Sequence, residues 1–105
     1  MATTDFTGAS ILIAGGSGGL GSALATTLAD RGARLALLGR DAGRLGAVAV
    51  PALRIRADIR RGEDCDRAVQ RTLDEYGAID GVVNAAGVVA FGPLAETSDE
   101  VLDAL

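Results

Sequence analysis

The sequence predicts an α/β protein: part of a doubly wound parallel sheet with helices on both of its faces. Three observations point to this fold class. Short apolar runs alternate with stretches of helical spacing, a glycine-rich turn follows the first apolar run, and aromatic residues are scarce. Alternation of strand and helix is typical of parallel strands joined by right-handed crossovers. We expect the strands in the spatial order 3-2-1-4, which is half of a doubly wound sheet.

The first half of the chain supplies two predicted strands and two predicted helices. The apolar run SILIA at 10–14 predicts a buried strand, and the leucine spacing over 19–32 predicts a helix with Gly32 as the glycine that ends it. A second apolar run predicts a strand at 34–38. Asp41 can cap a short helix through about residue 47, because a short carboxylate accepts from the first free N–H groups. Pro51 blocks the continuation of that helix.

The second half repeats this pattern. Residues 53–57 alternate apolar and basic side chains, which predicts a third strand at a sheet edge with one wetter face. Helical spacing over 62–76 predicts a helix that ends at Gly77, and 80–84 predicts a fourth strand. We expect a loop over 85–94 and a last helix that begins near Thr97–Ser98. All of these elements fit one domain over residues 1–105.

Composition excludes several kinds of chemistry. The net charge is −4, and all ten basic residues are arginines, with no lysine or histidine. A nucleic-acid partner is not expected, since it requires clustered cations. The composition also excludes a Walker lysine and a Ser-His-Asp site, and we expect no metal site. Cys65 is the only cysteine and lies between two aspartates, which disfavours its thiolate. No basic leader or run of roughly 18 apolar residues occurs, so we expect a cytoplasmic protein without a membrane partner.

The segment Gly15–Gly21 (GGSGGLG) lies between the first predicted strand and the first predicted helix. Glycines let the backbone approach a pyrophosphate, and the N-terminus of the helix favours an anion. Glycine strings also form ordinary tight turns. The position after the first strand of a β-α-β unit favours a dinucleotide site.

Three motifs in the same order resemble those of the short-chain dehydrogenase/reductase family. Gly15–Gly21 is similar to TGxxxGxG, with Ala14 in place of threonine. The segment 84–87 (NAAG) resembles NNAG, with Ala85 in place of the second asparagine. Asp58 fits the acidic residue after the third strand. The resemblance covers the whole chain and implies a Rossmann-like cofactor-binding half-domain.

The resemblance implies the residues that contact the cofactor. Asp58 would accept a hydrogen bond from the adenine amino group, with Ile59 packed on the ring. Alternatively, Asp58 is a solvated carboxylate or leads into the next helix, and Asn84 only fixes the end of its strand. The residues implied around the pyrophosphate and its ribose are Gly15, Ser17, Gly18, Gly19, Leu20 and Gly21. Those implied to line the ribose floor and to support the central sheet are Asn84, Ala86 and Gly87.

Arg40 favours NADP(H) over NAD(H). An acidic residue at the end of the second strand holds the ribose 2′-OH of NAD, whereas an arginine accommodates a 2′-phosphate. Gly39 occupies the expected acidic position, and Arg40 follows with a permanently charged donor fork. Asp41 could still reach a ribose, so NAD remains the less favoured alternative. A second basic cluster is interleaved with acids, so we expect a solvated, ion-paired surface there: Arg54, Arg56, Arg60 and Arg61.

No catalytic residue can be assigned in this chain. The family uses a Tyr-xxx-Lys pair on a later helix, but the position four residues after Tyr76 holds Asp80. We therefore expect Tyr76 to be structural and this chain alone to be inactive, as part of a longer reductase with a small-molecule substrate. Ending there would make the fourth strand, around 81–83, a sheet edge. Such an edge predicts self-association as a homo-oligomer.

The favoured function is an NAD(P)(H)-dependent oxidoreductase of the short-chain type, acting on a carbonyl or alcohol and represented by its cofactor-binding half. Two alternatives remain open at this point. One is a non-catalytic nucleotide-binding or interaction module, and the other is a ketoreductase segment of a multi-domain synthase.

Overall fold

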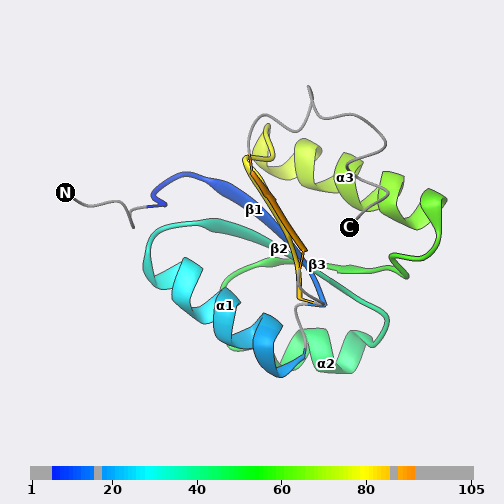
Figure 1. Cartoon of the computed structure of the whole chain (residues 1–105), viewed down its shortest axis with the longest axis horizontal. Coiled ribbons are helices and arrows are strands. Elements are labelled where there is room, and N and C mark those ends of the chain that lie inside the picture. The colour runs from blue at the N-terminus through cyan, green and yellow to red at the C-terminus, as the bar shows by residue number, and fades with distance from the viewer. Residues whose placement is uncertain (1–5, 16–17, 86–87, 92–105) are drawn as a thin grey trace.

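A computed structural model describes residues 6–15, 18–85 and 88–91. Within these residues, a five-stranded sheet carries three helices (Figure 1). In chain order the elements are β1 (Ser10–Ala14), α1 (Gly19–Asp30), β2 (Arg34–Gly39), α2 (Ala42–Ala47), β3 (Leu53–Arg56), α3 (Gly62–Tyr76), β4 (Gly81–Asn84) and β5 (Val88–Phe91). The predicted strands and helices up to β4 are all present, with ends that differ by at most two residues.

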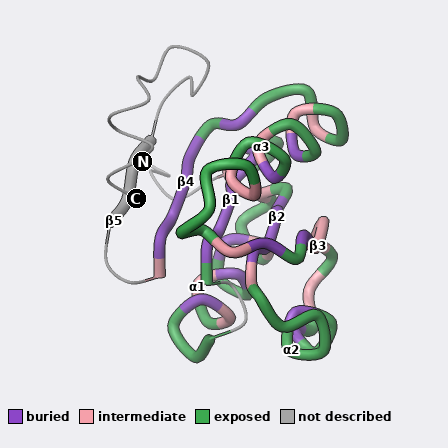
Figure 2. Tube along the Cα trace, turned by 90° about the vertical axis from the view of Figure 1, so that its right-hand side faces the viewer, coloured by how far each residue is buried: buried purple, intermediate pink, exposed green. Residues whose placement is uncertain are grey.

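The sheet has the order β3-β2-β1-β4-β5, in which the first four strands are parallel. This confirms the predicted 3-2-1-4 order. On β1, Ile13 is paired with Leu37 of β2 on one side and with Val83 of β4 on the other. Since parallel strands need covered faces, these central strands are almost entirely buried, as Figure 2 shows for β1 and β4.

Two predictions about the end of the sheet are wrong. The expected loop over 85–94 contains β5, which pairs antiparallel with β4 and places Val83 opposite Val89. The run Val88–Phe91 has two valines and a phenylalanine, which are good strand formers, and pairing gives its backbone groups hydrogen-bond partners. β4 is therefore an inner strand and not the sheet edge. The prediction of a homo-oligomer rested on an open β4 edge, and this structure gives it no support.

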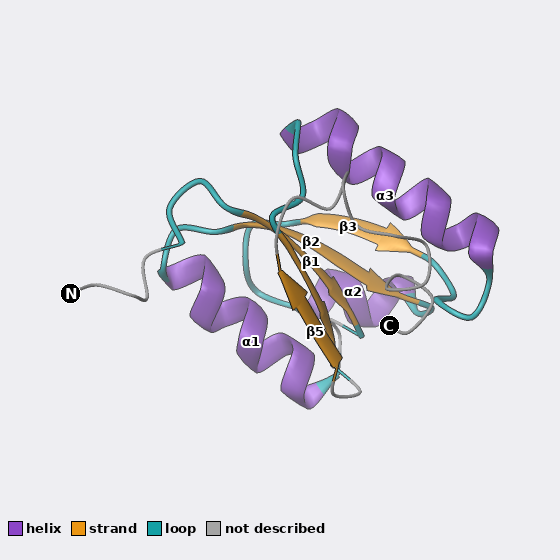
Figure 3. Cartoon of the chain, turned by 45° about the horizontal axis from the view of Figure 1, so that its top comes forward, coloured by secondary structure: helices purple, strands orange, loops and turns teal. Residues whose placement is uncertain are grey.

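The helices cover the two faces of the sheet. α1 and α2 lie on one face and α3 on the other (Figures 1 and 3). Each face has its own apolar cluster, as expected for a three-layer α/β fold. The buried cluster under α1 and α2 contains Ile11, Ile13, Ala25, Leu28, Leu35, Leu37, Leu45, Val48 and Val83. The buried cluster under α3 contains Leu12, Ala36, Leu38, Ile55, Ala57, Ala68, Ile79 and Val82.

The helix ends follow the chemistry predicted for them. α1 gives way to Gly32, whose φ of +90° is left-handed, and a Cβ there would lie 2.8 Å from Thr7 Oγ1. Asp41 caps α2, and its side chain accepts a hydrogen bond from Arg44 N at 3.1 Å. α3 ends at Gly77 as expected. The predicted helix near Thr97–Ser98 lies outside the described residues.

The arginines around β3 do not form one uniform surface. Arg60 and Arg61 are exposed and pair with Asp58 and Glu63, which confirms a solvated, ion-paired surface for these two. The prediction of a solvated, ion-paired side chain is wrong for Arg54. This arginine is only partly exposed, and its guanidinium donates to backbone carbonyls, among them Leu45 O at 2.8 Å. The alternating pattern of β3 could not reveal this, because the partners come from the segment packed over the strand.

Tyr76 is structural, as predicted. Its hydroxyl donates to the Leu35 carbonyl at 2.7 Å, and the Arg34 guanidinium lies 5.1 Å from the centre of its ring. These contacts tie the end of α3 to β2, on the side of the fold where the strands begin. In the part of the chain that the structure describes, no helix is both long and apolar enough to cross a membrane.

Candidate functional site

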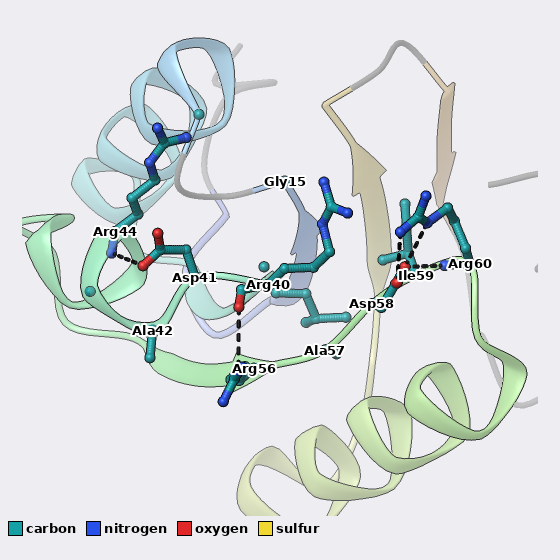
Figure 4. Close-up of a pocket in the computed structure, with 14 residues that line it drawn as sticks. Gly15, Arg40, Asp41, Ala42, Arg44, Arg56, Ala57, Asp58, Ile59 and Arg60 are labelled. Carbon is teal, nitrogen blue, oxygen red and sulfur yellow. Dashed lines mark hydrogen bonds and ion pairs between the residues drawn. The ribbon is translucent and has the colours of Figure 1, made fainter.

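A cleft of about 990 Å³ opens where β1, β2 and β3 end (Figure 4). In open α/β sheets, ligands bind outside the carboxyl ends of the strands. Three segments form the cleft: the turn into α1, the turn into α2, and the loop from β3 to α3. The residues that line it are Gly15, Gly18, Leu38, Gly39, Arg40, Asp41, Ala42, Gly43, Arg44, Arg56, Ala57, Asp58, Ile59 and Arg60.

Gly15 turns the chain from β1 toward α1. Its φ of +76° is left-handed, and its N–H donates to the Leu38 carbonyl at 2.9 Å. A Cβ at this position would lie 3.2 Å from the Cβ of Ala85. The turn therefore requires glycine for backbone and packing reasons, whatever binds in the cleft.

Gly19 shows a different requirement. Gly19 is the first residue of α1, and apart from its chain neighbours and the backbone of its own helix, a Cβ placed on it would meet no atom of the described residues within 4 Å. The N-cap residue Gly18 has no side chain to cap this helix, whose first N–H groups lack intrahelical partners. The protein's own packing does not explain glycine here, whereas close approach of a phosphate to the backbone would. The residues present therefore fit the pyrophosphate of a dinucleotide.

Ser22, Leu20 and Gly21 occupy the first turn of α1. The Ser22 hydroxyl donates to the Gly18 carbonyl at 2.7 Å, so this serine bonds to the backbone at the start of α1. Leu20 is 58% exposed, which is unusual for a leucine and leaves an apolar side chain beside the glycine turn. Gly21 is buried, and this lets α1 pack closely on the sheet.

Arg40 follows β2, and its side chain extends into the cleft (Figure 4). Within the described ranges Arg40 belongs to none of the ion pairs. The neighbouring Asp41 uses one carboxylate oxygen to cap α2. This arrangement offers a permanently charged donor to a ligand and commits part of the nearest carboxylate to the protein.

Asp58 also lines the cleft and follows β3, from which it is separated by Ala57. Its Oδ1 accepts from Arg60 Nε at 3.1 Å and its Oδ2 from Arg60 Nη2 at 3.0 Å. These side-chain bonds, with a further bond from the Arg60 backbone N–H, lower the pKa of Asp58 from 3.8 to about 2. Asp58 is therefore ionised at neutral pH and is an acceptor only.

Ile59 is the apolar residue next to Asp58 in the cleft. It is 39% exposed, although it lies between the ionised Asp58 and the charged Arg60. An exposed isoleucine in a polar cleft provides a flat apolar contact for a ring. The carboxylate and the apolar side chain together suit a heterocyclic base that carries an amino group.

The cleft gathers some of the predicted site residues. Gly15, Gly18, Arg40, Asp58 and Ile59 line it. Gly19, Leu20 and Gly21 lie next to it at the start of α1. Asn84 ends β4, is 7% exposed, and is paired in register with Ala14. Ser17, Ala86 and Gly87 lie outside the described residues.

Sequence reasoning assigned no ligand role to several cleft residues. Arg44 and Arg56 bring two further guanidinium groups to the cleft, and Arg60 engages Asp58. The first two could have been anticipated from their position just beyond or at the carboxyl ends of β2 and β3. No group of three or more metal-ligating side chains occurs among the described residues.

A parallel sheet with a glycine turn after β1 and a cleft at its carboxyl edge defines the class of nucleotide-binding α/β proteins. Comparison with known families makes this specific. The family model for short chain dehydrogenase matches residues 9–105. The chain belongs to this family, as its sequence motifs predicted.

Curated relatives extend well beyond this chain. An 11-beta-hydroxysteroid dehydrogenase A of Sesamum indicum is 36% identical over 103 residues, which are 90% of this chain and 30% of the relative. An uncharacterized oxidoreductase of Thermotoga maritima is 31% identical over 104 residues, covering 94% of this chain and 41% of the relative. The chain thus spans less than half the length of these proteins.

Solved structures share the fold. A dehydrogenase/reductase from Sinorhizobium meliloti matches with a TM-score of 0.74 and 36% identity, over 95% of this chain and 44% of that one. A 3-ketoacyl-(acyl-carrier-protein) reductase from Brucella melitensis, complexed with NADH, has a TM-score of 0.72 and 32% identity over 74% of this chain and 34% of that one. The family and these neighbours support binding of a nicotinamide dinucleotide.

Proposed function

We propose that this chain is the cofactor-binding half of an NADP(H)-dependent oxidoreductase that interconverts a carbonyl and an alcohol. The observation that carries the proposal is the cleft itself. Its glycine turn fits a pyrophosphate, and Arg40 stands at the end of β2, where the adenosine ribose is held in this class of fold. The bound nicotinamide would accept or donate the hydride.

The preference for NADP(H) rests on the charges at the end of β2. Arg40 and Arg44 both line the cleft, and a guanidinium matches a phosphate with paired hydrogen bonds. Asp41 is the residue that could hold an unphosphorylated ribose, but its Oδ1 caps α2. NAD(H) is the alternative, and a structural neighbour is complexed with NADH.

Catalysis is proposed to require residues beyond this chain. The only tyrosine, Tyr76, is bonded to the Leu35 carbonyl and has no lysine four residues later. We therefore expect nucleotide binding without turnover from residues 1–105. Relatives are named for a hydroxysteroid, ipsdienol and levodione, so the substrate is proposed only as a carbonyl or alcohol.

A nuclear magnetic resonance titration with 2′,5′-ADP tests this proposal. The ligand carries adenine and the 2′-phosphate and has no nicotinamide. Expected are amide shift changes at Gly15, Gly18, Arg40 and Ile59, which line the cleft, and none over 66–76 of α3. Arg40→Met should abolish the changes near β2. Changes spread evenly over the surface, or none at all, would contradict a nucleotide site in this cleft.

A further inference from the structure

Arg54 of β3 makes an unusual set of contacts for an arginine at a sheet edge. Its guanidinium donates to four backbone carbonyls: Leu45 O at 2.8 Å, Ala52 O at 3.1 Å, Val48 O at 2.6 Å and Val50 O at 2.8 Å. A guanidinium has five N–H donors in fixed geometry, so it can hold several carbonyls at once. Arg54 therefore fixes the end of α2 and the segment that follows it.

The alternation of β3 explains why Arg54 reaches this segment. Successive side chains of a strand point to opposite faces. Leu53 and Ile55 pack in the apolar cluster under α3, so Arg54 and Arg56 face the side that carries α2. Leu45 belongs to the last turn of α2, and Val48 is its C-terminal cap. Leu45 O and Val48 O each also accept one backbone N–H, at 3.3 Å and 3.0 Å, so Arg54 adds a second donor to both carbonyls and ties the helix end to β3.

Arg56 holds the other end of the same unit. Its Nε donates to the Arg40 carbonyl at 3.2 Å, as the dashed line in Figure 4 shows. Arg54 therefore fixes the C-terminal end of α2, and Arg56 fixes the turn between β2 and α2. α2 has only six residues and is too short to be stable alone, so contacts with the rest of the fold must set its position.

We propose that Arg54 is a positioning residue for cofactor choice: by fixing α2, it holds Arg40 and Arg44 where they select a 2′-phosphate. This inference rests on the proposed function. Paired hydrogen bonds to phosphate are strong only when the guanidinium is held within roughly 0.5 Å of its working geometry. Releasing α2 should weaken the contacts to the 2′-phosphate and leave those of the glycine turn intact.

A merely structural role makes a different prediction. If Arg54 only stabilised the fold, its loss would lower the affinity for NADPH and NADH by the same factor. The ratio of the two dissociation constants therefore separates the two roles. Arg71, an exposed arginine on α3, provides a matched control for the loss of one positive charge.

The test compares four variants of the full chain: Arg54→Met, Arg54→Lys, Arg71→Met and the double variant Arg54→Met/Arg40→Met. Arg54→Met should reduce the preference for NADPH over NADH by about fivefold, the usual scale of coupling through a contact network. Arg54→Lys, which retains the charge but cannot reach four carbonyls, should give a smaller loss. Compared with Arg40→Met alone, the double variant should lose less preference through Arg54→Met than the native chain does, because only Arg44 remains to be displaced.

Amide hydrogen exchange provides a readout that needs no nucleotide. Arg54→Met should speed exchange over 44–50 and leave α1 and α3 unchanged. An unchanged exchange pattern, or an equal loss of affinity for both nucleotides, would overturn the proposal. If Arg54→Met does not fold, Arg54→Lys carries both measurements. A native chain that does not prefer NADPH would contradict the cofactor proposal and the role in selection, while exchange would still show whether Arg54 fixes α2.

Discussion

Arg60 holds both carboxylate oxygens of Asp58, through Nε to Oδ1 at 3.1 Å and Nη2 to Oδ2 at 3.0 Å. The two residues lie in the loop between β3 and α3, where the charge of Arg40 also helps to lower the pKa of Asp58. Through this pair, an exposed arginine lowers the pKa and occupies part of the hydrogen-bonding capacity of the carboxylate at the proposed adenine position. The pKa of Asp58 can therefore be tested without a ligand.

The first prediction concerns the pKa of Asp58. Arg60→Gln should raise it from about 2 toward 3.8, because the hydrogen bonds from the Arg60 side chain are the largest cause of the lowered value. Since the folded pKa is depressed, the stabilisation from this pair is fully present above about pH 4 and is lost as pH falls toward 2. Titration of the Asp58 carboxyl carbon by nuclear magnetic resonance measures the shift. Arg71→Gln is the control and should change nothing.

The second prediction concerns base recognition. Asp58→Ala should weaken binding of NADPH by about tenfold, the scale of one hydrogen bond to a charged group. It should not weaken binding of the hypoxanthine analogue, because that base lacks the amino group. Fluorescence titration with both nucleotides measures the two affinities. Asp66→Ala, an exposed carboxylate on α3, serves as the control. An equal loss for both bases would show that Asp58 acts through the loop and not on the amino group.

The third prediction separates stability from binding at Gly19. Gly19→Ala should stabilise the fold by about 0.5 kcal/mol, since glycine in a helix is entropically costly and the new Cβ clashes with none of the described residues. The same change should weaken nucleotide binding at least about tenfold, because the methyl group occupies the space proposed for the pyrophosphate. Urea unfolding and calorimetric titration give the two quantities.

The control for this prediction is Gly46→Ala in α2, where the new Cβ also meets nothing within 4 Å. It should stabilise the fold similarly and leave binding unchanged. Gly15→Ala should instead destabilise the fold by about 1–2 kcal/mol, since its φ is +76°. If Gly19→Ala binds NADPH normally, the pyrophosphate does not lie where we propose.

The fourth prediction tests the structural role of Tyr76. Tyr76→Phe should destabilise the chain by about 1 kcal/mol, because the Leu35 carbonyl loses its side-chain donor. Binding of NADPH should stay unchanged, and so should turnover by a longer protein that contains this chain. Thermal unfolding and steady-state kinetics measure these effects. Loss of turnover without loss of stability would reassign Tyr76 to the reaction.

Features of the fold that depend on local sequence could be predicted, whereas those that depend on contacts between distant segments could not. The strand order followed from the alternation of apolar runs with helical spacing, and the helix end at Gly77 from glycine chemistry. β5 was missed because Val88–Phe91 follows a motif that resembles a cofactor loop, and its pairing partner β4 was assigned to an open edge. That pairing is a choice between alternatives that only the assembled sheet decides.

In the candidate site, too, local sequence predicts the positions of some residues but not the contacts of others. The position of Arg40 and Asp58 at the ends of β2 and β3 follows from fold class and spacing. The roles of Arg54 and Arg60 do not, because an arginine in a mixed-charge segment gives no sign of whether it faces solvent, a carboxylate or a row of carbonyls. Packing of α2 over β3 decides that for Arg54.

The central claim is that the cleft selects a 2′-phosphorylated dinucleotide through Arg40. The most direct measurement is calorimetric titration of the chain and of Arg40→Met with NADPH and NADH. The account predicts that the native chain binds NADPH at least about tenfold more tightly, and that Arg40→Met removes this preference with little change in the affinity for NADH. Equal affinities in the native chain, or a preference that survives the loss of Arg40, would contradict it.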